Sequence, residues 1–345
     1  MNEAETVTPD IKSVVQNILE GIEREREREI IARRFGLYDR KETLEQIGEL
    51  LGITRERVRQ LEKAILIRLK IAADEGRLEL EQVERYLVQH LHEMGRAGRI
   101  AELAERVLPG SGERERAHVA FVSELSPKLS VLNENDNYHH GVALSEHHDE
   151  KQLKKRVDEM VKTIKEHGQA LSGDELHAKT SYEHPDHARA LAGLSKNVAR
   201  LRDQWGLTKW PTVNPKNIRD KIYVILQENT RPMHFSEIAK AIKDSDFKRK
   251  DVTTQAIHNE LIKDKRFVLI GRGIYALNEW GYKKGTVSDI ITEVLKKAGE
   301  PLHRDEIVKR VLKDRQVKET TILLNLQSKP LFKRVAKATY TLAEK

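Results

Sequence analysis

The sequence has no cysteine, few aromatic residues and no long apolar run. Among its 345 residues, Phe, Trp and Tyr together make up 5%. The absence of cysteine excludes disulfides and thiolate metal ligands. The scarcity of aromatic residues, together with 34% charged residues, favours small helical units over a large sheet enzyme. A chain of this length is expected to form several domains rather than one core.

The sequence also lacks targeting and membrane signals. It contains no stretch of about 18 apolar residues, and residues 1–12 have no apolar core of signal-peptide length. We therefore expect a cytoplasmic protein without a membrane span. The net charge is +7, and residues 216–345 contain 28 Lys and Arg against 17 Asp and Glu. This basic part is typical of a phosphate-binding surface, although lysine-rich solvated helices give the same balance.

Residues 44–70 have the pattern of two short amphipathic helices separated by a turn. The apolar residues of the second helix recur at steps of three and four, and they are Val58, Leu61, Ile65 and Leu69. Gly52 fits the tight end of the first helix, Ile53 fits the space between the helices, and Thr54 fits the cap of the second. This layout predicts a helix-turn-helix whose second helix enters the DNA major groove.

The polar residues of the predicted second helix are candidates for DNA binding. These candidates are Arg55, Glu56, Arg57, Arg59, Gln60 and Lys63. Glu56, Arg59 and Gln60 fall roughly opposite the apolar side, as does Lys63, one turn further along. Arginine pairs with guanine, glutamine with adenine, and glutamate accepts from cytosine, whereas Lys63 is expected at a phosphate. The alternative is a solvated face on a helical bundle.

Together with its upstream segment, this stretch resembles region 4 of bacterial primary-type sigma factors. The resemblance rests on a charged run before Ile30 and Ile31, on RRFGL at 33–37, on TLEQIG at 43–48 and on TRERVRQ at 54–60. In that family the module reads the −35 promoter element and docks on the polymerase flap. The resemblance therefore implies that Arg55, Glu56, Arg59 and Gln60 face bases. It also implies double-stranded DNA and RNA polymerase as partners.

The resemblance covers only residues 21–70. No segment resembles the sigma regions that bind the −10 element and melt DNA, so we do not expect a complete sigma factor. The alternating charged run at 23–29 is interpreted as a solvated helix start, because Glu and Arg three residues apart can pair on one helix.

Four later stretches repeat one pattern, in which an amphipathic helix is followed by a second helix. They are GRAGRIAELAERV from Gly95, GQALSGDELHAKT from Gly168, TRPMHFSEIAKAI from Thr230 and GEPLHRDEIVKRV from Gly299. A third helix follows each of them. Residues 267–277 and 332–342 then match at a distance of 65 residues and predict two short strands with a turn. Three helices and a small hairpin make a winged helix, and such repeats indicate units strung along the chain.

We therefore expect a mainly α fold, with an N-terminal helix-turn-helix followed by four tandem winged-helix units with small β wings. The predicted domains are 1–76, 77–146, 147–215, 216–284 and 285–345. Residues 216–284, with RPMHFSEIAKAI and GRGIYALNEWGY, resemble the HARE-type helix-turn-helix domain. The ending is also similar to that of the bacterial polymerase delta subunit. The first resemblance implies a link to DNA and the second implies binding to RNA polymerase.

Basic residues of 216–284 are further candidates for phosphate contacts. Lys248, Arg249 and Lys250 precede the predicted third helix of this domain. Lys263, Lys265, Arg266 and Arg272 cluster around its predicted wing. A solvated surface is the alternative. The aromatic residues Trp205, Trp210, Tyr275, Trp280 and Tyr282 stand at wing ends, where closing the small core is favoured over stacking on bases.

The sequence offers no site for catalysis or for a cofactor. Histidines occur at 139–140, 147–148, 184 and 187, but their spacing does not suit metal ligands, and a proline that fits a helix start separates His184 from His187. His234 and His303 stand at matching repeat positions and are expected to cap or pack. Phosphate loops, nucleophile elbows and paired nuclease carboxylates are absent from the sequence. We expect neither an enzyme nor a protein with a metal, cofactor or small-molecule substrate.

We weigh three functional hypotheses for this sequence. In the first, the chain is a bacterial DNA-binding transcription regulator that reads a −35-like promoter element and acts with RNA polymerase. In the second, it is a delta-like interaction protein of RNA polymerase without a specific DNA site of its own. A third hypothesis, the specificity part of a nuclease, requires catalytic carboxylates that the sequence lacks.

Overall fold

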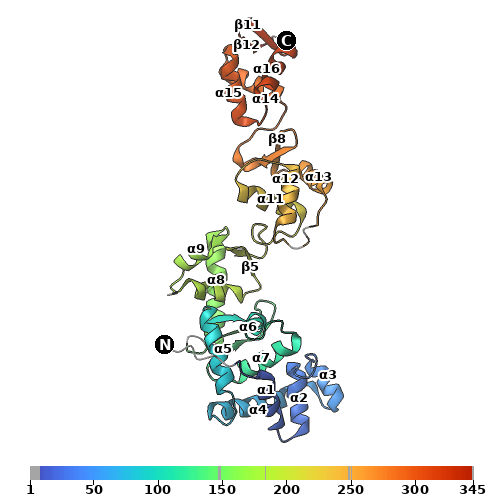
Figure 1. The fold of residues 1–345 in the computed structure, drawn as a ribbon, viewed down its shortest axis with the longest axis vertical. Helices are drawn as coiled ribbons and strands as arrows, with labels where there is room; N and C mark the ends of the chain where they lie inside the picture. The colour runs from blue at the N-terminus through green and yellow to red at the C-terminus, as the bar shows by residue number, and fades with distance from the viewer. Residues whose placement is uncertain (1–7, 147–148, 183, 248, 250, 344–345) are drawn as a thin grey trace. The chain divides into compact units, whose positions relative to one another are not determined.

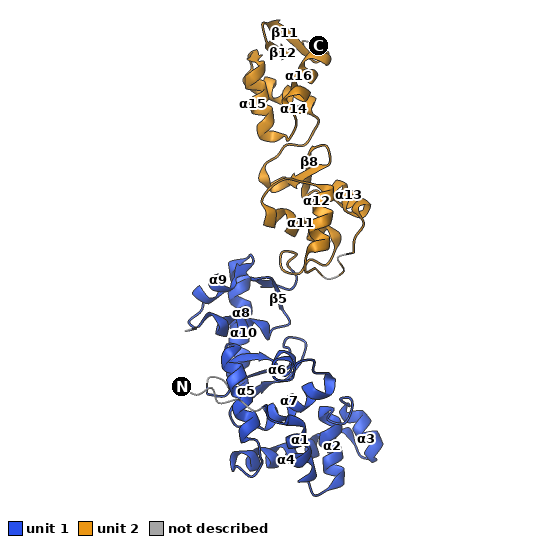
Figure 2. Ribbon diagram, in the orientation of Figure 1, with its two compact units in different colours: residues 1–209 blue, residues 210–345 orange. Residues whose placement is uncertain are grey.

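The computed structural model describes residues 8–146, 149–182, 184–247, 249 and 251–343. In these residues the chain is mainly helical, with sixteen α-helices, twelve short strands and one 3-10 helix. It forms two compact units, Met1–Lys209 and Trp210–Lys345 (Figure 2). None of the described helices is both long and apolar enough to cross a membrane.

Four helices make up the N-terminal module of the first compact unit (Figure 1). They are α1 (Ile11–Glu20), α2 (Glu25–Phe35), α3 (Leu44–Leu51) and α4 (Arg55–Asp74). Gly52 ends α3 in the left-handed region at φ 64°, which glycine adopts without a Cβ clash. Thr43 and Thr54 cap α3 and α4 through their side-chain oxygens. The predicted helix-turn-helix is therefore present as α3 and α4.

After this module, the described residues show one element order four times: helix, strand, helix, helix, strand, strand. Repeat A comprises α5 (Glu81–Glu93), β1 (Ala97–Arg99), α6 (Ile100–Val107), α7 (Glu113–Leu125), β2 (Leu129–Leu132) and β3 (Gly141–Leu144). Repeat B comprises α8 (Glu150–His167), β4 (Leu171–Ser172), α9 (Gly173–Ala178), α10 (Pro185–Gly193), β5 (Val198–Leu201) and β6 (Gln204–Leu207).

The other two repeats belong to the second compact unit. Repeat C comprises α11 (Ile218–Asn229), β7 (Met233–His234), α12 (Phe235–Asp244), α13 (Thr254–Lys263), β8 (Phe267–Gly271) and β9 (Ile274–Leu277), and the 3-10 helix η1 (Asn278–Trp280) follows it. Repeat D comprises α14 (Val287–Ala298), β10 (Leu302–His303), α15 (Arg304–Asp314), α16 (Glu319–Ser328), β11 (Phe332–Ala336) and β12 (Thr339–Leu342).

Each repeat contains a three-stranded antiparallel sheet whose last strand lies in the middle. The strand orders are β1-β3-β2, β4-β6-β5, β7-β9-β8 and β10-β12-β11. The predicted strand pair is present in repeat C, where Phe267 pairs with Leu277. It is also present in repeat D, where Phe332 pairs with Leu342. The four repeated sequence stretches therefore supply the first strand and second helix of each repeat.

The N-terminal module and repeat A share one hydrophobic core. Its fully buried members include Ile31 and Ile65 from the module and Leu87, Leu103, Val119 and Phe121 from repeat A. Phe35 of α2 meets Phe121 of α7 edge to face, with ring centroids 5.0 Å apart, an arrangement that the aromatic quadrupoles favour. Arg114 Nε of α7 also donates a hydrogen bond to the Leu37 carbonyl at 3.2 Å. The module therefore packs on repeat A as part of one body.

Repeat B is joined to repeat A through the backbone as well as through side chains. Arg99 Nε of repeat A donates to the Gly193 carbonyl of α10 at 2.7 Å. Tyr138 forms an isolated antiparallel bridge with Ser195, and its hydroxyl donates to the Asp158 carboxylate at 2.8 Å. Burial and this carboxylate raise the pKa of Tyr138 to about 12, so the hydroxyl remains a donor.

Repeats C and D are linked by the segment between α15 and α16. The buried guanidinium of Arg315 donates to the carbonyls of Leu269 and Gly285. The Gln316 amide donates to the Ile270 carbonyl at 3.1 Å. Repeat D thus contacts β8, the edge strand of the repeat C sheet.

Candidate nucleic-acid interface

The outward face of α4 is fixed by how its first turns pack against α2 and α3. Ile30, Ile47 and Val58 form a small, fully buried core, and Ile53 packs against it as predicted. At Gly48 of α3, a Cβ would lie 2.7 Å from the Ile53 carbonyl, so the turn packs closely against α3 because no side chain is present. The apolar side of α4 therefore faces these two helices, and its polar side faces solvent.

All six residues that were predicted on this helix are exposed: Arg55, Glu56, Arg57, Arg59, Gln60 and Lys63. Glu56 is the centre of a surface network. Arg59 donates to both of its carboxylate oxygens, from Nε at 2.8 Å and from Nη2 at 2.6 Å. Gln60 Nε2 donates to the same carboxylate at 3.3 Å. This network holds the functional groups of Arg59 and Gln60 side by side.

The flanking cations of α4 are held more loosely. Arg55 Nη1 donates to Glu45 Oε1 of α3 at 3.3 Å, and Arg57 Nη1 donates to Gln60 Oε1 at 3.4 Å. Lys63 makes neither a hydrogen bond nor an ion pair within the described part of the chain. Arg57 and Lys63 have no ion pair within the described residues, and the exposed pair of Arg55 with Glu45 costs little to exchange for an anionic partner.

The Glu56–Arg59 pair stays charged over the whole physiological pH range. The hydrogen bonds from Arg59 lower the pKa of Glu56 to about 2, and the same carboxylate raises the pKa of Arg59. Four cations and one carboxylate give the face a positive field, which attracts phosphates. An exposed ion pair contributes little in water, so Arg59 can exchange Glu56 for another partner at small cost.

The third helices of repeats A and B offer no comparable face. In α7 the second half is buried on all sides, and its buried residues are His118, Val119, Ala120, Phe121, Val122, Ser123 and Leu125. The helices α1, α2 and α4 pack against it. In α10 the buried residues are His187, Ala188, Leu191 and Ala192, and this helix packs on β1 of repeat A. Both helices are therefore internal parts of the first compact unit.

The third helices of repeats C and D are different. In α13 only Ile257 and Leu261 are buried, and in α16 only Ile322 and Leu326 are buried. One side of each helix packs on its own repeat while the other side faces solvent. These two helices, together with α4, therefore present exposed faces that a ligand can reach, with Ile262 on α13 and Leu324 on α16 among their exposed side chains.

The structure describes two of the four residues proposed as phosphate contacts in repeat C, Arg249 and Arg272. Lys248 and Lys250 lie outside the described residues. Arg249 has a positive φ of 53°, and its carbonyl accepts a hydrogen bond from Lys221 Nζ at 2.8 Å. Arg272 is exposed at the tip of the β8–β9 hairpin. Contact of these residues with DNA stays a prediction.

Arg266 does not fit the basic cluster that was predicted around this wing. Its guanidinium donates to Asp264 at 2.7 Å and to Asp220 at 3.1 Å, and it lies over the Tyr223 ring at 5.4 Å from the centroid. These contacts hold Arg266 against α11 and raise its pKa, with the hydrogen bond to Asp264 as the main cause. Because its donors are occupied internally, Arg266 is not available for a phosphate.

Three of the histidines singled out from the sequence cap helices. His234 and His303 cap α12 and α15 as predicted, because their Nδ1 atoms accept backbone N–H groups at 3.3 Å and 3.4 Å. His184 caps α10, which begins at the predicted proline. Residues 147–148 lie outside the described part. Among the residues that are described, no group of three or more His, Asp or Glu is placed to hold a metal ion.

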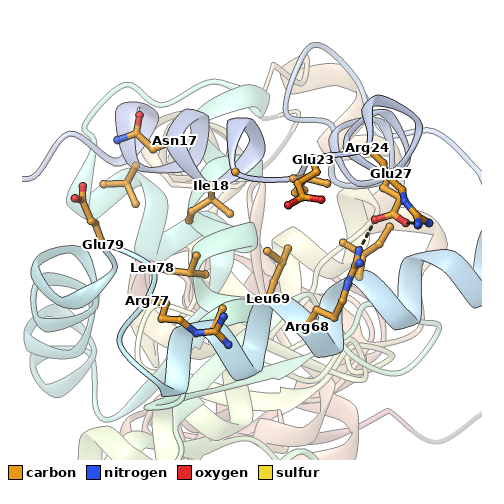
Figure 3. A pocket seen from close by; sticks show the side chains of 15 residues that line it. Asn17, Ile18, Glu23, Arg24, Glu27, Arg68, Leu69, Arg77, Leu78 and Glu79 are labelled. Carbon is orange, nitrogen blue, oxygen red and sulfur yellow. Dashed lines mark hydrogen bonds and ion pairs between the residues drawn. The ribbon is translucent and has the colours of Figure 1, made fainter.

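A groove of about 710 Å³ lies between α1, α4 and the segment that follows α4 (Figure 3). Ile18 and Leu69 form part of its apolar floor, and acidic and basic side chains both line its rim. The charged run at 23–29 was predicted to be solvated, but its Glu27 is buried at this rim and paired with Arg68. The prediction was wrong here because Glu27 faces α4. A rim of both signs does not favour a phosphate backbone.

Two polar residues on α13 were not among the predicted site residues. Gln255 and Asn259 are exposed on the side opposite Ile257 and Leu261. The same helical periodicity that identified the α4 face identifies them, since they stand four residues apart between the apolar positions.

Comparison with known proteins identifies one part of the chain. The family model "Sigma-70, region 4" matches residues 24–70, which confirms the resemblance predicted for this module. The RNA polymerase sigma factor RpoD of Helicobacter pylori is 43% identical over 63 residues, which are 18% of this chain and 9% of that protein. The RNA polymerase sigma factor SigA1 of Synechococcus elongatus is 41% identical over 75 residues, 20% of this chain and 19% of that protein.

A plant protein shows the same limited match. The RNA polymerase sigma factor sigB of Arabidopsis thaliana is 50% identical over 46 residues, 13% of this chain and 8% of that protein. The chain thus spans less than a fifth of the length of each of these three relatives. The family match at residues 24–70 covers the helix-turn-helix module and none of the four repeats.

Proposed function

We propose that this chain is a sequence-specific DNA-binding transcription regulator that is not a complete sigma factor. In this proposal α4 reads a −35-like promoter element, and the chain acts with RNA polymerase. The exposed face of α4, within the segment that matches sigma-70 region 4, is the observation that supports the proposal most.

The chemistry of this face suits base edges in the major groove. A guanidinium donates two hydrogen bonds to guanine, a carboxamide pairs with adenine, and a carboxylate accepts from cytosine. Arg59, Gln60 and Glu56 supply these three groups within two turns of one helix. Arg55, Arg57 and Lys63 flank them as phosphate contacts, which set register rather than sequence preference.

We further propose that repeats A to D are four winged-helix units with the domains 77–146, 147–215, 216–284 and 285–345, after a module at 1–76. Their common element order and their three-stranded sheets support this assignment. The resemblance of 216–284 to HARE-type domains and to the polymerase delta subunit supports a role in transcription. Lys248, Arg249, Lys250 and Arg272 are the phosphate contacts proposed for that domain.

One observation favours the second hypothesis, a polymerase-associated protein without its own DNA site. The arginines of α4 already pair with carboxylates, since Arg55 contacts Glu45 and Arg59 contacts Glu56. Acidic side chains of a protein partner can replace these carboxylates as readily as phosphates can. The experiment must therefore separate sequence preference from capture by polymerase.

Selection of bound sites from random duplex DNA, with and without RNA polymerase, tests the proposal. We expect Arg59→Ala to cost about 1–3 kcal/mol on the selected site and much less on random DNA. Lys63→Ala is the matched control. Removal of a phosphate-binding ammonium group should weaken binding to the selected site and to random DNA by similar amounts. Both side chains are exposed, so neither variant should unfold. The proposal fails if Arg59→Ala keeps the site preference but abolishes capture by polymerase.

A further inference from the structure

The exposed face of α13 in repeat C carries two neutral amides, one apolar side chain and one lysine. Thr253 caps this helix through its side chain, and Ile257 and Leu261 fix its inner side. The outer side carries Gln255, Asn259, Ile262 and Lys263, all of which are exposed. Their steps of four, three and one place them along one stripe of the helix.

Two carboxamides lie side by side in this stripe. Gln255 Nε2 donates to Asn259 Oδ1 at 3.1 Å, so the two groups are held next to each other. Gln255 Oε1 and Asn259 Nδ2 have no hydrogen bond within the described residues. The pair therefore offers one acceptor and one donor to a ligand, at adjacent positions on an open surface.

The surroundings of the stripe favour an anionic ligand. Lys263, Lys265 and Arg272 are exposed and make no ion pair within the described part of the chain. The nearest acidic side chain on the helix, Glu260, is half-buried and lies 3.9 Å from Arg219. The stripe itself carries no carboxylate, so nothing on it repels phosphates.

The composition of the stripe argues for DNA rather than protein. Protein interfaces place aromatic residues, methionine and arginine at their centre, and this stripe has none of them. Carboxamides form bidentate pairs with the N6 and N7 atoms of adenine, and apolar side chains contact the thymine methyl group. Ile262, which is 64% exposed, lies beside the amides on the same stripe.

We infer that α13 is a second base-reading helix, which recognises A·T base pairs in the major groove of duplex DNA. Gln255 and Asn259 bind adenine, Ile262 contacts thymine methyl groups, and Lys263, Lys265 and Arg272 bind the flanking phosphates. In α16 the position equivalent to Asn259 is Leu324, so repeat D has no such amide pair. The inference goes beyond the proposed function, because it adds a second DNA element that α4 does not read.

Selection of bound sites with the full chain, without polymerase, tests this inference. The wild-type chain should select two separate elements, one of which contains A·T pairs. The double variant Gln255→Ala, Asn259→Ala should lower the preference for that element by about tenfold or more, and leave the other element unchanged. Arg59→Ala should do the reverse, so failure at α13 and failure at α4 are distinguishable. Lys263→Ala should weaken binding to DNA with the A·T element and to random DNA by similar amounts.

A second substitution guards against an effect on folding. Asn259→Asp keeps the side-chain shape but removes the donor, so it should also reduce the A·T preference while the thermal transition stays in place. The inference is overturned if the wild type selects only one element, or if both variants keep the A·T preference. It is also overturned if the double variant keeps that preference and instead loses capture by RNA polymerase, because α13 would then be a protein-docking face.

Discussion

The helices α7 and α13 hold the same place in their repeats but have opposite surroundings. In α7 a continuous run from His118 to Ser123 is buried, because the N-terminal module packs over the side that α13 leaves open. In α13 two residues are buried, and the outer stripe of amides, Ile262 and Lys263 is exposed. The element order alone therefore does not determine whether a third helix is accessible to a ligand. What covers the helix decides it, and in repeat A the cover is the sigma-like module itself.

The hairpins of repeats A and D show the same contrast in burial as the third helices. All four residues of β3 in repeat A are buried, and the bridge at Tyr138 ties this hairpin to repeat B. In repeat D only Phe332 of β11 is buried, and Lys333 and Arg334 are exposed. Repeat A thus uses both its third helix and its hairpin for internal packing, whereas repeat D leaves most of these two surfaces open to solvent.

The strongest test of this contrast is a pair of core truncations. Phe121→Ala should destabilise the first compact unit by about 3–5 kcal/mol, because it removes a fully buried ring that packs on Phe35. The amides of Ile30 and Ile31 should lose hydrogen-exchange protection although they lie in the N-terminal module. Ile257→Ala in α13, the matched truncation, should destabilise repeat C by about 2–5 kcal/mol and leave those amides protected. Unchanged protection of the module in Phe121→Ala would show that the shared core does not couple it to repeat A.

A smaller effect is expected from the exposed hairpin of repeat D. Lys333→Ala with Lys337→Ala should reduce the slope of log affinity against log salt by about 1 for each phosphate that is no longer bound. Binding to random duplex DNA at several salt concentrations measures this slope. The control removes the same charge from α8 with Lys154→Ala and Lys162→Ala, whose ammonium groups pair with acidic residues of the same helix. Equal slopes for the two double variants would show that Lys333 and Lys337 do not contact phosphates.

The smallest effect concerns the α4 network in the free protein. Arg59 holds the pKa of Glu56 at about 2, below its ordinary value of 4.5. Because this pKa is lowered on folding, the contribution of the pair is fully present above pH 4.5 and is lost as the pH falls towards 2. Titration of the Glu56 carboxyl by NMR should therefore give a midpoint near 2 in the wild type and near 4.5 in Arg59→Ala. Lys63→Ala should leave the midpoint at its wild-type value, and a low midpoint in Arg59→Ala would assign the shift to another cause.

The features that the sequence predicts well are those with local causes. The turn at Gly52, the cap at Thr54 and the exposed face of α4 depend on residues within one or two turns of each other. Of the five aromatic residues predicted to close the small cores, Trp205 and Tyr275 are buried, and Trp210, Trp280 and Tyr282 are half-buried. The turn, the cap and the α4 face are decided by neighbours in the sequence. Trp205 and Tyr275 instead pair with Leu171 and Met233, and only the repeat made their burial predictable.

The features that the sequence did not predict have distant causes. Phe121 meets Phe35 although the two belong to helices far apart in the chain, and Glu27 is buried by a helix whose Arg68 lies 41 residues later. A pattern within α7 shows that it is apolar on several sides, but not which segment covers it. The DNA contacts of α4 and α13 stay predictions, because exposure and hydrogen-bonding capacity define a surface without naming its ligand.

The shared core of the module and repeat A bears on how such a chain can change in evolution. A sigma-type region 4 that is a separate cassette can be gained or lost by one recombination event at its boundary. Here Ile31 and Ile65 are buried in the core that also holds Phe121, so a break after residue 70 would expose apolar surface on both products. Neither product would be a well-packed domain until several residues had been replaced. The helix-turn-helix module and the neighbouring repeat are therefore expected to be inherited as one piece.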